Sequence, residues 1–397
     1  MHFKNLSLCV ISAALVCLET EAGFAQEADL PVAPEPVDYV RLCDAYGLRF
    51  YYVPGTETCL RVGGRLRVDY RLNNFGSSPN DWDSNEDNAT SFLARAYIYL
   101  DARTQTEFGL LRTYTSVYFS NINGAQTPEV EYAFIELGGF TFGEAQSFYD
   151  FWTGYSFGVQ LTDYSDVKNR LLAYTAGFGN GLSATLSIEE SMTRQSLLIA
   201  PATPATSANG NAGMRLPDLV GNLRIEQGWG SAQIMGALHH VKFADTTAKG
   251  TLGWALGGGV EVNVPALGQG DAIALQIGYA DGANGYPMDS WDSQITDAIN
   301  TGGVTRTTRS WNIGGGWNHN FTDMLEANLE GGYHVADAAT NARDFSQWGL
   351  TGNLVWHPVG GLDIGTELQY RRVDYKAASG LADKDELYAT FRVQRTF

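Results

Sequence analysis

Hydrophobic and polar side chains alternate along most of the chain after residue 60. In residues 308–319, Trp311 and Ile313 fall on one face of an extended chain, while Asn312 and Asn318 fall on the other. The same pattern recurs in 251–264, 324–335, 346–357 and 386–397. Successive side chains of a β-strand point to opposite faces, so the pattern predicts strands with one apolar face and one polar face. Many such segments of about ten residues are typical of a transmembrane antiparallel β-barrel.

The alternating segments predict an all-β barrel of sixteen strands, with eighteen as the nearest rival count. The expected strands are 60–71, 91–102, 107–119, 128–138, 139–146, 170–178, 181–190, 218–227, 231–242, 251–264, 271–281, 308–319, 324–335, 346–357, 361–374 and 386–397. Short turns such as Asn180-Gly181 alternate with long polar connections, as in outer-membrane barrels. The long connections are 73–90, 191–216, 282–308 and 375–385. A barrel of this size has a lumen too wide for side chains to fill, so it holds water.

The first 59 residues differ from the rest of the chain. Residues 1–25 combine Lys4 with an apolar run and then small residues at Gly23 and Ala25, which predicts a cleaved export signal rather than an uncleaved anchor. Residues 26–59 read as an extended lead-in, Pro-rich at its start, and the barrel is expected to occupy 60–397. Later apolar runs fall short of the roughly 18 residues of a transmembrane helix, so any span must be built from strands.

Two cysteines remain after the expected signal is removed, Cys43 and Cys59. An even pair in an exported chain favours a disulfide. A metal or redox site is the alternative, although no second cysteine pair and no cluster of histidines accompanies them.

The last expected strand reaches Phe397, with Leu387 and Phe391 on the same apolar face. We expect this strand to pair with the strand that begins near Leu60, because a barrel must leave no open edge. Arg395 interrupts the apolar face and is expected to extend to the periplasmic rim.

Charge indicates which faces meet water. The chain has 26 basic and 44 acidic side chains, a net charge of −18, which argues against a nucleic-acid partner. Arginines recur on one face of 60–71, and Arg95 and Arg112 are expected to point the same way from the next two strands. A lipid-facing arginine costs roughly 2–4 kcal/mol near the bilayer midplane, so the lumen is the expected location. A rim or subunit salt bridge is the alternative for each one. The arginines of the first strand are Arg61, Arg65, Arg67 and Arg71.

Residues 147–169 break the alternation. They form a long connection after the fifth expected strand, rich in aromatic residues, and they carry Asp150, Asp163 and Asp166. A solvated loop rarely carries so many aromatic residues, so we expect it to fold into the lumen, with its acids facing the arginines of the wall. Opposed charges of this kind predict a transverse field and, in so acidic a chain, weak cation selectivity. A surface lid or a subunit contact is the alternative.

Two stretches near the start of the chain are specific in sequence: DLPVAPEPVDYVRLCDAYG at 29–47 and PGTETCLRVGG at 54–64. They closely resemble the opening of the alphaproteobacterial (Rhizobiales-type) outer-membrane porins. The resemblance implies a homotrimeric porin in contact with outer-membrane lipid and lipopolysaccharide, which passes small hydrophilic solutes and ions passively. It also implies that Cys43 and Cys59 are paired and that 147–169 is the constriction loop. Phe391 and Phe397 then belong to the strand that the insertion machinery reads.

Catalytic and cofactor motifs are absent from the sequence. The six histidines are scattered, and neither a His-Glu-x-x-His pair nor a Gly-x-Ser-x-Gly elbow occurs, so no enzyme, cofactor or metal is expected. The acidic stretch 81–87 partly resembles a calcium loop but lacks its sixth-position Gly and its terminal acid, which favours a solvated loop over weak divalent binding. The sequence predicts a diffusion channel. The alternatives are a channel selective for one solute class, a barrel enzyme and a barrel with no open pore.

Overall fold

The computed structural model describes residues 41–158, 164–196, 213–244, 246, 248–287, 295–339 and 344–397. The described residues all belong to one compact unit. The expected export signal and residues 26–40 of the expected lead-in lie outside the described residues. In the described part of the chain, no helix is long and apolar enough to cross a membrane.

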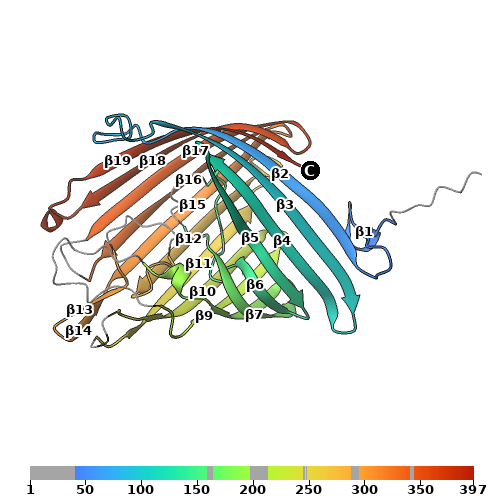
Figure 1. The fold of residues 1–397 in the computed structure, drawn as a ribbon, viewed down its shortest axis with the longest axis horizontal. Helices are drawn as coiled ribbons and strands as arrows, with labels where there is room; N and C mark the ends of the chain where they lie inside the picture. Colours follow the sequence, from blue (N-terminus) through green and yellow to red (C-terminus); the bar gives the residue numbers. More distant parts are fainter. Residues whose placement is uncertain are drawn as a thin grey trace, which may run out of the picture. The chain divides into compact units, whose positions relative to one another are not determined.

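Within the described residues, sixteen antiparallel strands form a closed barrel (Figure 1). They are β2 (Cys59–Leu72), β3 (Thr90–Thr106), β4 (Gly109–Ile122), β5 (Ala125–Leu137), β6 (Phe140–Gln146), β7 (Lys168–Gly179), β8 (Leu182–Glu189), β9 (Asp218–Gln227), β10 (Gly230–Val241), β11 (Thr251–Asn263), β12 (Ala272–Asp281), β15 (Arg309–Thr322), β16 (Leu325–Asp337), β17 (Phe345–Val359), β18 (Leu362–Tyr375) and β19 (Lys384–Thr396). Each pairs with the next, β12 pairs with β15, and β19 pairs with β2 to close the ring. The predicted count of sixteen is confirmed.

The smaller elements lie in the connections. Strand β1 (Tyr51–Tyr52) pairs with the start of β2, and β13 (Ala298–Thr301) pairs with β14 (Val304–Thr307) as a hairpin inside the connection that was expected to be a plain loop. Three short 3₁₀ helices complete the set of described elements: η1 (Asp44–Tyr46), η2 (Met192–Arg194) and η5 (Ala377–Ser379).

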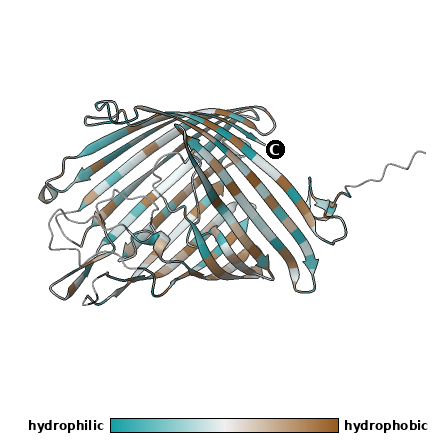
Figure 2. Cartoon of the chain, in the orientation of Figure 1, coloured by the Kyte–Doolittle hydropathy of each residue, from teal (hydrophilic) through white to brown (hydrophobic). Residues whose placement is uncertain are grey.

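The predicted alternation separates two faces of the barrel wall, and bands of opposite hydropathy follow one another along the strands (Figure 2). On β15, Trp311 and Trp317 are each 38% exposed, whereas Asn312 between them is fully buried. The exposed apolar face suits lipid, since a transmembrane barrel turns its apolar side chains outward. The opposite face is called the inner face below.

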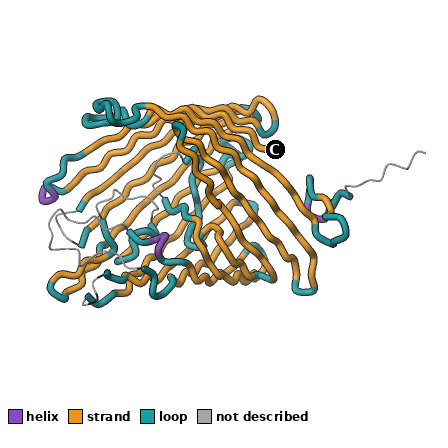
Figure 3. Tube along the Cα trace, viewed as in Figure 1, coloured by secondary structure: helices purple, strands orange, loops and turns teal. Residues whose placement is uncertain are grey.

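Turns and loops lie at the two ends of the strands (Figure 3). The predicted Asn180-Gly181 turn joins β7 to β8, and both residues have positive φ, 52° and 77°. A second tight turn, Asn123-Gly124, joins β4 to β5 with φ of 51° and 92°, where a longer connection was expected. Asn-Gly suits a two-residue hairpin because both central positions need positive φ. Because polar residues flank this turn, the sequence did not indicate where β4 ends and β5 begins.

Strand β19 closes the barrel against β2. Phe391 pairs with Tyr70, and beyond the last ladder pair the backbone amides and carbonyls of Phe397 and Gly64 exchange hydrogen bonds of 3.0 and 3.1 Å. Arg395 is exposed and donates to the carbonyl of Gly360, in the turn between β17 and β18. The strand therefore ends at a rim, as expected.

A short disulfide-bonded segment, here called the disulfide knot, ends at the first residue of β2. Cys43 and Cys59 form a disulfide with their Cα atoms 6.0 Å apart, and both are buried with Phe50. The guanidinium groups of Arg61 and Arg103 lie 5.1 and 4.9 Å from the centre of the Phe50 ring. These cation–π contacts attach the knot to the first two barrel strands.

Candidate functional site: a charged cavity and the segment beside it

Inner-face side chains surround a cavity of about 780 Å³. Strands β2, β3 and β19 contribute arginines to its lining, and β5 and β6 contribute glutamates. Residues of the connection between β6 and β7 and residues of β17 and β18 also line it. Among the described residues, the lining carries five basic side chains (Arg65, Arg67, Arg95, Lys168 and Arg392) and five acidic ones (Glu129, Glu131, Glu144, Asp166 and Asp363). The cavity is therefore polar and close to electrical balance.

Three arginines share one carboxylate, that of Asp69. Arg392 of β19 binds both of its oxygens, at 2.7 and 3.0 Å, while Arg67 and Arg71 donate to it at 2.8 and 3.0 Å. Asp69 is fully buried. The predicted arginine row thus contains its own counter-ion, which sequence reasoning missed. Strict alternation could have found it, because Asp69 occupies the inward position between Arg67 and Arg71.

Two further arginines lie over tyrosine rings. The guanidinium of Arg65 is 3.8 Å from the centre of the Tyr97 ring, and that of Arg95 is 4.2 Å from the centre of the Tyr118 ring. Arg95 also donates to the hydroxyl of Ser120 at 2.7 Å. Stacked and hydrogen-bonded, these side chains hold their charge at fixed positions on the wall.

A β-bulge places an extra acid on the inner face. The register between β4 and β5 shifts between Ser116 and Val117, and Glu131 is the residue left without a ladder partner. Its carboxylate accepts from the Ser116 hydroxyl at 2.5 Å and lies 3.8 Å from Arg65. Bulges of this kind re-aim side chains near functional sites.

The predicted site residues divide between this cavity and other places. Asp166 lines the cavity together with Arg65, Arg67 and Arg95, and its nearest cation is Lys168 at 3.1 Å. Asp163 lies outside the described residues.

Arg61 and Arg112 do not line the cavity. Their guanidinium groups lie 3.6 and 3.1 Å from the buried carboxylate of Asp101, which also binds Arg103 at 2.8 Å. Both arginines occupy inner-face positions, as alternation predicts. They belong to a separate charge cluster around Asp101, and Arg112 also donates to Glu136 at 3.1 Å.

Asp150 does not face the arginines of the wall. It is buried in an ion pair with Arg194 at 2.7 Å, and neither side chain is exposed. Alternation offers no guide to partners here, because both residues lie in connections between strands.

Residues 147–158 contact inner-face side chains of many strands. Backbone amides of Trp152, Tyr155 and Phe157 donate to Gln276 of β12 at 3.2 Å, Glu330 of β16 at 2.7 Å and Glu367 of β18 at 2.5 Å. Further contacts reach β9, through Asn222 to the carbonyl of Phe148, and β19, through Arg392 to the carbonyl of Phe157. The expected polarity is thus reversed over this stretch: acids on the wall hold the backbone of the segment.

Glycines on the inner face make room for the aromatic rings of the segment. A Cβ atom at Gly259 would lie 2.3 Å from the Phe151 ring, and one at Gly316 would lie 2.7 Å from the Trp152 ring. The same holds at Gly365, where a Cβ would lie 2.7 Å from the Phe157 ring. The signal was present in the sequence as glycines at inward positions of the alternating strands.

Two phenols of the connection donate to carboxylates of the wall. Tyr155 binds Glu261 at 2.5 Å and Tyr164 binds Glu330 at 3.2 Å. Burial, and then the neighbouring carboxylates, raise the pKa of both phenols above the ordinary value. Both hydroxyls therefore keep their protons at neutral pH and remain donors.

Comparison with known proteins places this barrel in a family. The sequence model of the Porin subfamily matches residues 29–394. The porin Omp2b of Brucella abortus is 28% identical over 417 aligned residues that cover the whole of both chains, and Omp2b of Brucella suis matches equally. Among solved structures, the outer-membrane channel DcaP of Acinetobacter baumannii covers 87% of this chain and 99% of its own, at 14% identity and a TM-score of 0.69. The trimer form of OmpT of Vibrio cholerae covers 86% and 100%, at 10% identity and a TM-score of 0.54.

The match of the family model runs from the lead-in to the closing strand, and the relatives align over their full length. The predicted resemblance is confirmed. The chain belongs to the Porin subfamily, and it forms a channel for passive diffusion in the Gram-negative outer membrane.

Proposed function

We propose that residues 147–158 lie in the lumen and narrow the channel, so that small hydrophilic solutes and ions pass through the cavity beside them. One observation carries this proposal: backbone amides along the segment donate to inner-face side chains of β12, β16 and β18. A surface lid would not contact the inner face of so many strands. Residues of the segment, Thr153 and Ser156 among them, also line the cavity.

The charges of the lining favour general diffusion over selection of one solute class. Five basic and five acidic side chains among the described lining residues leave no large excess of either sign. The net charge of the whole chain, −18, attracts cations to the mouths of the channel. We therefore propose a non-enzymatic channel with weak cation selectivity.

A homotrimer is the proposed assembly. The support is the family membership, together with the trimer form of OmpT of Vibrio cholerae, which has the same kind of barrel. Lipid and lipopolysaccharide are the proposed surroundings, since the outer face exposes apolar side chains on every side of the barrel.

A pair of adjacent glycines tests the position of the segment. Gly259 faces Phe151, whereas a Cβ at Gly258 would meet only ordinary contacts at 3.5 and 3.8 Å. Gly259→Val should push the segment away from β11 and toward the cavity, because overpacking a tight contact costs about 1–3 kcal/mol. Single-channel conductance in planar bilayers is then expected to fall for Gly259→Val.

Gly258→Val is the matched control, with the same added volume on the opposite face of the same strand. It should leave the conductance at the wild-type value. Equal conductance for both variants and the wild type, with both barrels folded, would contradict a segment seated on the inner face at Gly259.

A further inference from the structure

Arg194 is the largest fully buried side chain described, although it lies in a connection between strands. Its guanidinium donates to Asp150 at 2.7 Å, to the hydroxyl of Ser165 at 2.7 Å and to the carbonyl of Gly285 at 3.0 Å. These acceptors belong to two different connections, 147–167 and 282–308. Arg194 itself lies in a third connection, between β8 and β9. One side chain therefore joins three connections.

Asp150 and Ser165 lie on opposite limbs of the 147–167 connection. The Ser165 hydroxyl binds Asp150, the backbone amide of Val167 donates to Asp150 at 2.7 Å, and Gln146 donates to it at 2.5 Å. Arg194 completes this ring of contacts from outside the connection. These contacts hold the start and the end of the 147–167 connection together, and Arg194 links both to the connection between β8 and β9.

The surroundings of Arg194 favour its charged form. Burial acts to lower its pKa, but the neighbouring Asp150 raises that pKa above the ordinary value. The ring of Tyr286 lies 4.8 Å from the guanidinium. Removal of either partner of a buried ion pair leaves the other charge uncompensated, which strongly destabilises the arrangement that contains it.

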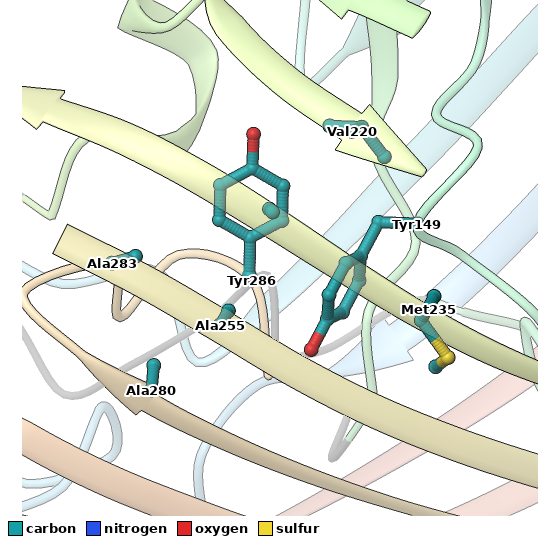
Figure 4. Close-up of a cluster of buried hydrophobic side chains, with 8 residues drawn as sticks. Tyr149, Val220, Met235, Ala255, Ala280, Ala283 and Tyr286 are labelled. Atoms are coloured by element: carbon teal, nitrogen blue, oxygen red, sulfur yellow. The ribbon is translucent and has the colours of Figure 1, made fainter. Parts of the chain in front are cut away.

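A hydrophobic cluster adjoins the ion pair. The rings of Tyr149 and Tyr286 are 4.9 Å apart, edge to face, and they pack among Val220, Met235 and small residues of the wall (Figure 4). Ala237, Ala255 and Ala280 belong to the wall, and Ala283 of the 282–308 connection packs beside them. Tyr149 comes from the 147–167 connection and Tyr286 from 282–308, so both connections are seated on the inner face of β9–β12.

Polar contacts attach the 282–308 connection to the wall and to the connection that carries Arg194. The hydroxyl of Tyr286 donates to Asp218 at 2.7 Å, and Nδ1 of His239 lies 2.9 Å from the same carboxylate. Asp297 accepts from the backbone amides of Ser196 and Asn284 at 2.9 and 2.7 Å. The connection that carries Arg194 is therefore itself fixed, and it can hold the 147–167 connection in place.

We propose that Arg194 is a positioning residue for the channel: with Asp150 and Ser165 it latches the 147–167 connection to its neighbours and so sets the width of the passage. The proposal rests on the proposed constriction by residues 147–158. Arg194 is far from residues 147–158 along the chain and does not line the cavity, yet the proposal assigns it control of the constriction.

The test compares Arg194→Met with Arg170→Met. Arg170 also contacts the connection that follows β8, through Glu190 and Thr193, but its side chain is 56% exposed. It makes no ion pair or side-chain hydrogen bond with the described residues of the 147–167 connection. Loss of one partner of a buried ion pair shifts a conformational equilibrium by a factor of about 100 or more. Arg194→Met channels in planar bilayers should therefore show open-channel current fluctuations and sublevels that the wild type and Arg170→Met lack.

Two more variants keep the test decisive. Arg194→Lys retains a charge beside Asp150 and should fluctuate less than Arg194→Met. Arg194→Met combined with Asp150→Asn removes the uncompensated buried charge, so the barrel should fold even where the single variant does not, while the latch stays absent and the fluctuations persist. Retention of the folded barrel is measured by heat-modifiable migration on a gel.

A quiet channel with wild-type conductance in the folded double variant would overturn the latch. The proposed constriction would then still stand if Gly259→Val lowers the conductance as expected. If Gly259→Val also left the conductance unchanged, the proposed constriction itself would be refuted. Failure of the latch and failure of the constriction therefore give different results.

Discussion

Charged side chains on the inner face are held in fixed positions by the groups around them. Asp69 binds Arg67, Arg71 and Arg392, and Arg65 contacts both the Tyr97 ring and Glu131. Fixed charges create a stronger local field than mobile ones, because they do not reorganise as a solute passes. The passage should therefore respond to single substitutions of its lining.

Two substitutions of opposite sign test this response. Asp166→Asn removes an acid that lies 3.1 Å from Lys168, and Arg95→Gln removes a cation from the same lining. We expect a weak cation preference in the wild type, a shift toward anions for Asp166→Asn and a shift toward cations for Arg95→Gln. The measurement is the reversal potential in a salt gradient at low ionic strength, where screening is weakest.

Each variant serves as the control for the other, since both change the lining by one charge. Shifts of the same sign, or a wild type that prefers anions, would refute the assignment of these residues to the ion path.

At the scale of elements, the strands were predictable and the contacts of the connections were not. Period-two alternation placed the sixteen strands because each strand obeys one local rule, that of an apolar outer face. The connection 147–167 obeys no such rule: its partners are Gln276, Glu330 and Glu367, more than 100 residues away in sequence. Its aromatic content indicated packing, but only the fold reveals which glycines receive the rings.

The β19–β2 seam also goes beyond local patterning. The Phe397 ring packs on Gly64, where a Cβ would lie 2.7 Å from the ring. Phe397→Ala removes this contact from the last residue of the seam while leaving its two backbone hydrogen bonds with Gly64. We expect the yield of folded barrel on refolding into lipid vesicles to fall, with a loss of about 1–2 kcal/mol in stability.

Phe321→Ala is the matched control for the seam. Phe321 also lies near the end of a strand, with an exposed fraction of 56% against 62% for Phe397, but it is remote from the seam. An equal fall in yield for both variants would assign the effect to the general loss of an exposed aromatic side chain rather than to closure.

For the molecule as a whole, the sequence predicted the class of protein better than the state of its charges. The barrel, the disulfide between Cys43 and Cys59 and the family follow from alternation, cysteine count and two short motifs. The buried position of Asp150 does not follow from the sequence, because its ion pair with Arg194 depends on how three connections meet. Long-range ion pairs leave no periodic trace in a single sequence.

The assembly is the remaining prediction at this scale. A barrel whose outer face is apolar on every side can be covered by lipid alone or partly by other subunits, and the proposed homotrimer requires the second arrangement. Light scattering in detergent, corrected for the bound detergent, should give a protein mass about three times that of one chain. Channels should then insert into planar bilayers in groups of three equal conductance steps. A mass of one chain in a preparation that still conducts in single steps would show that the barrel functions as a monomer.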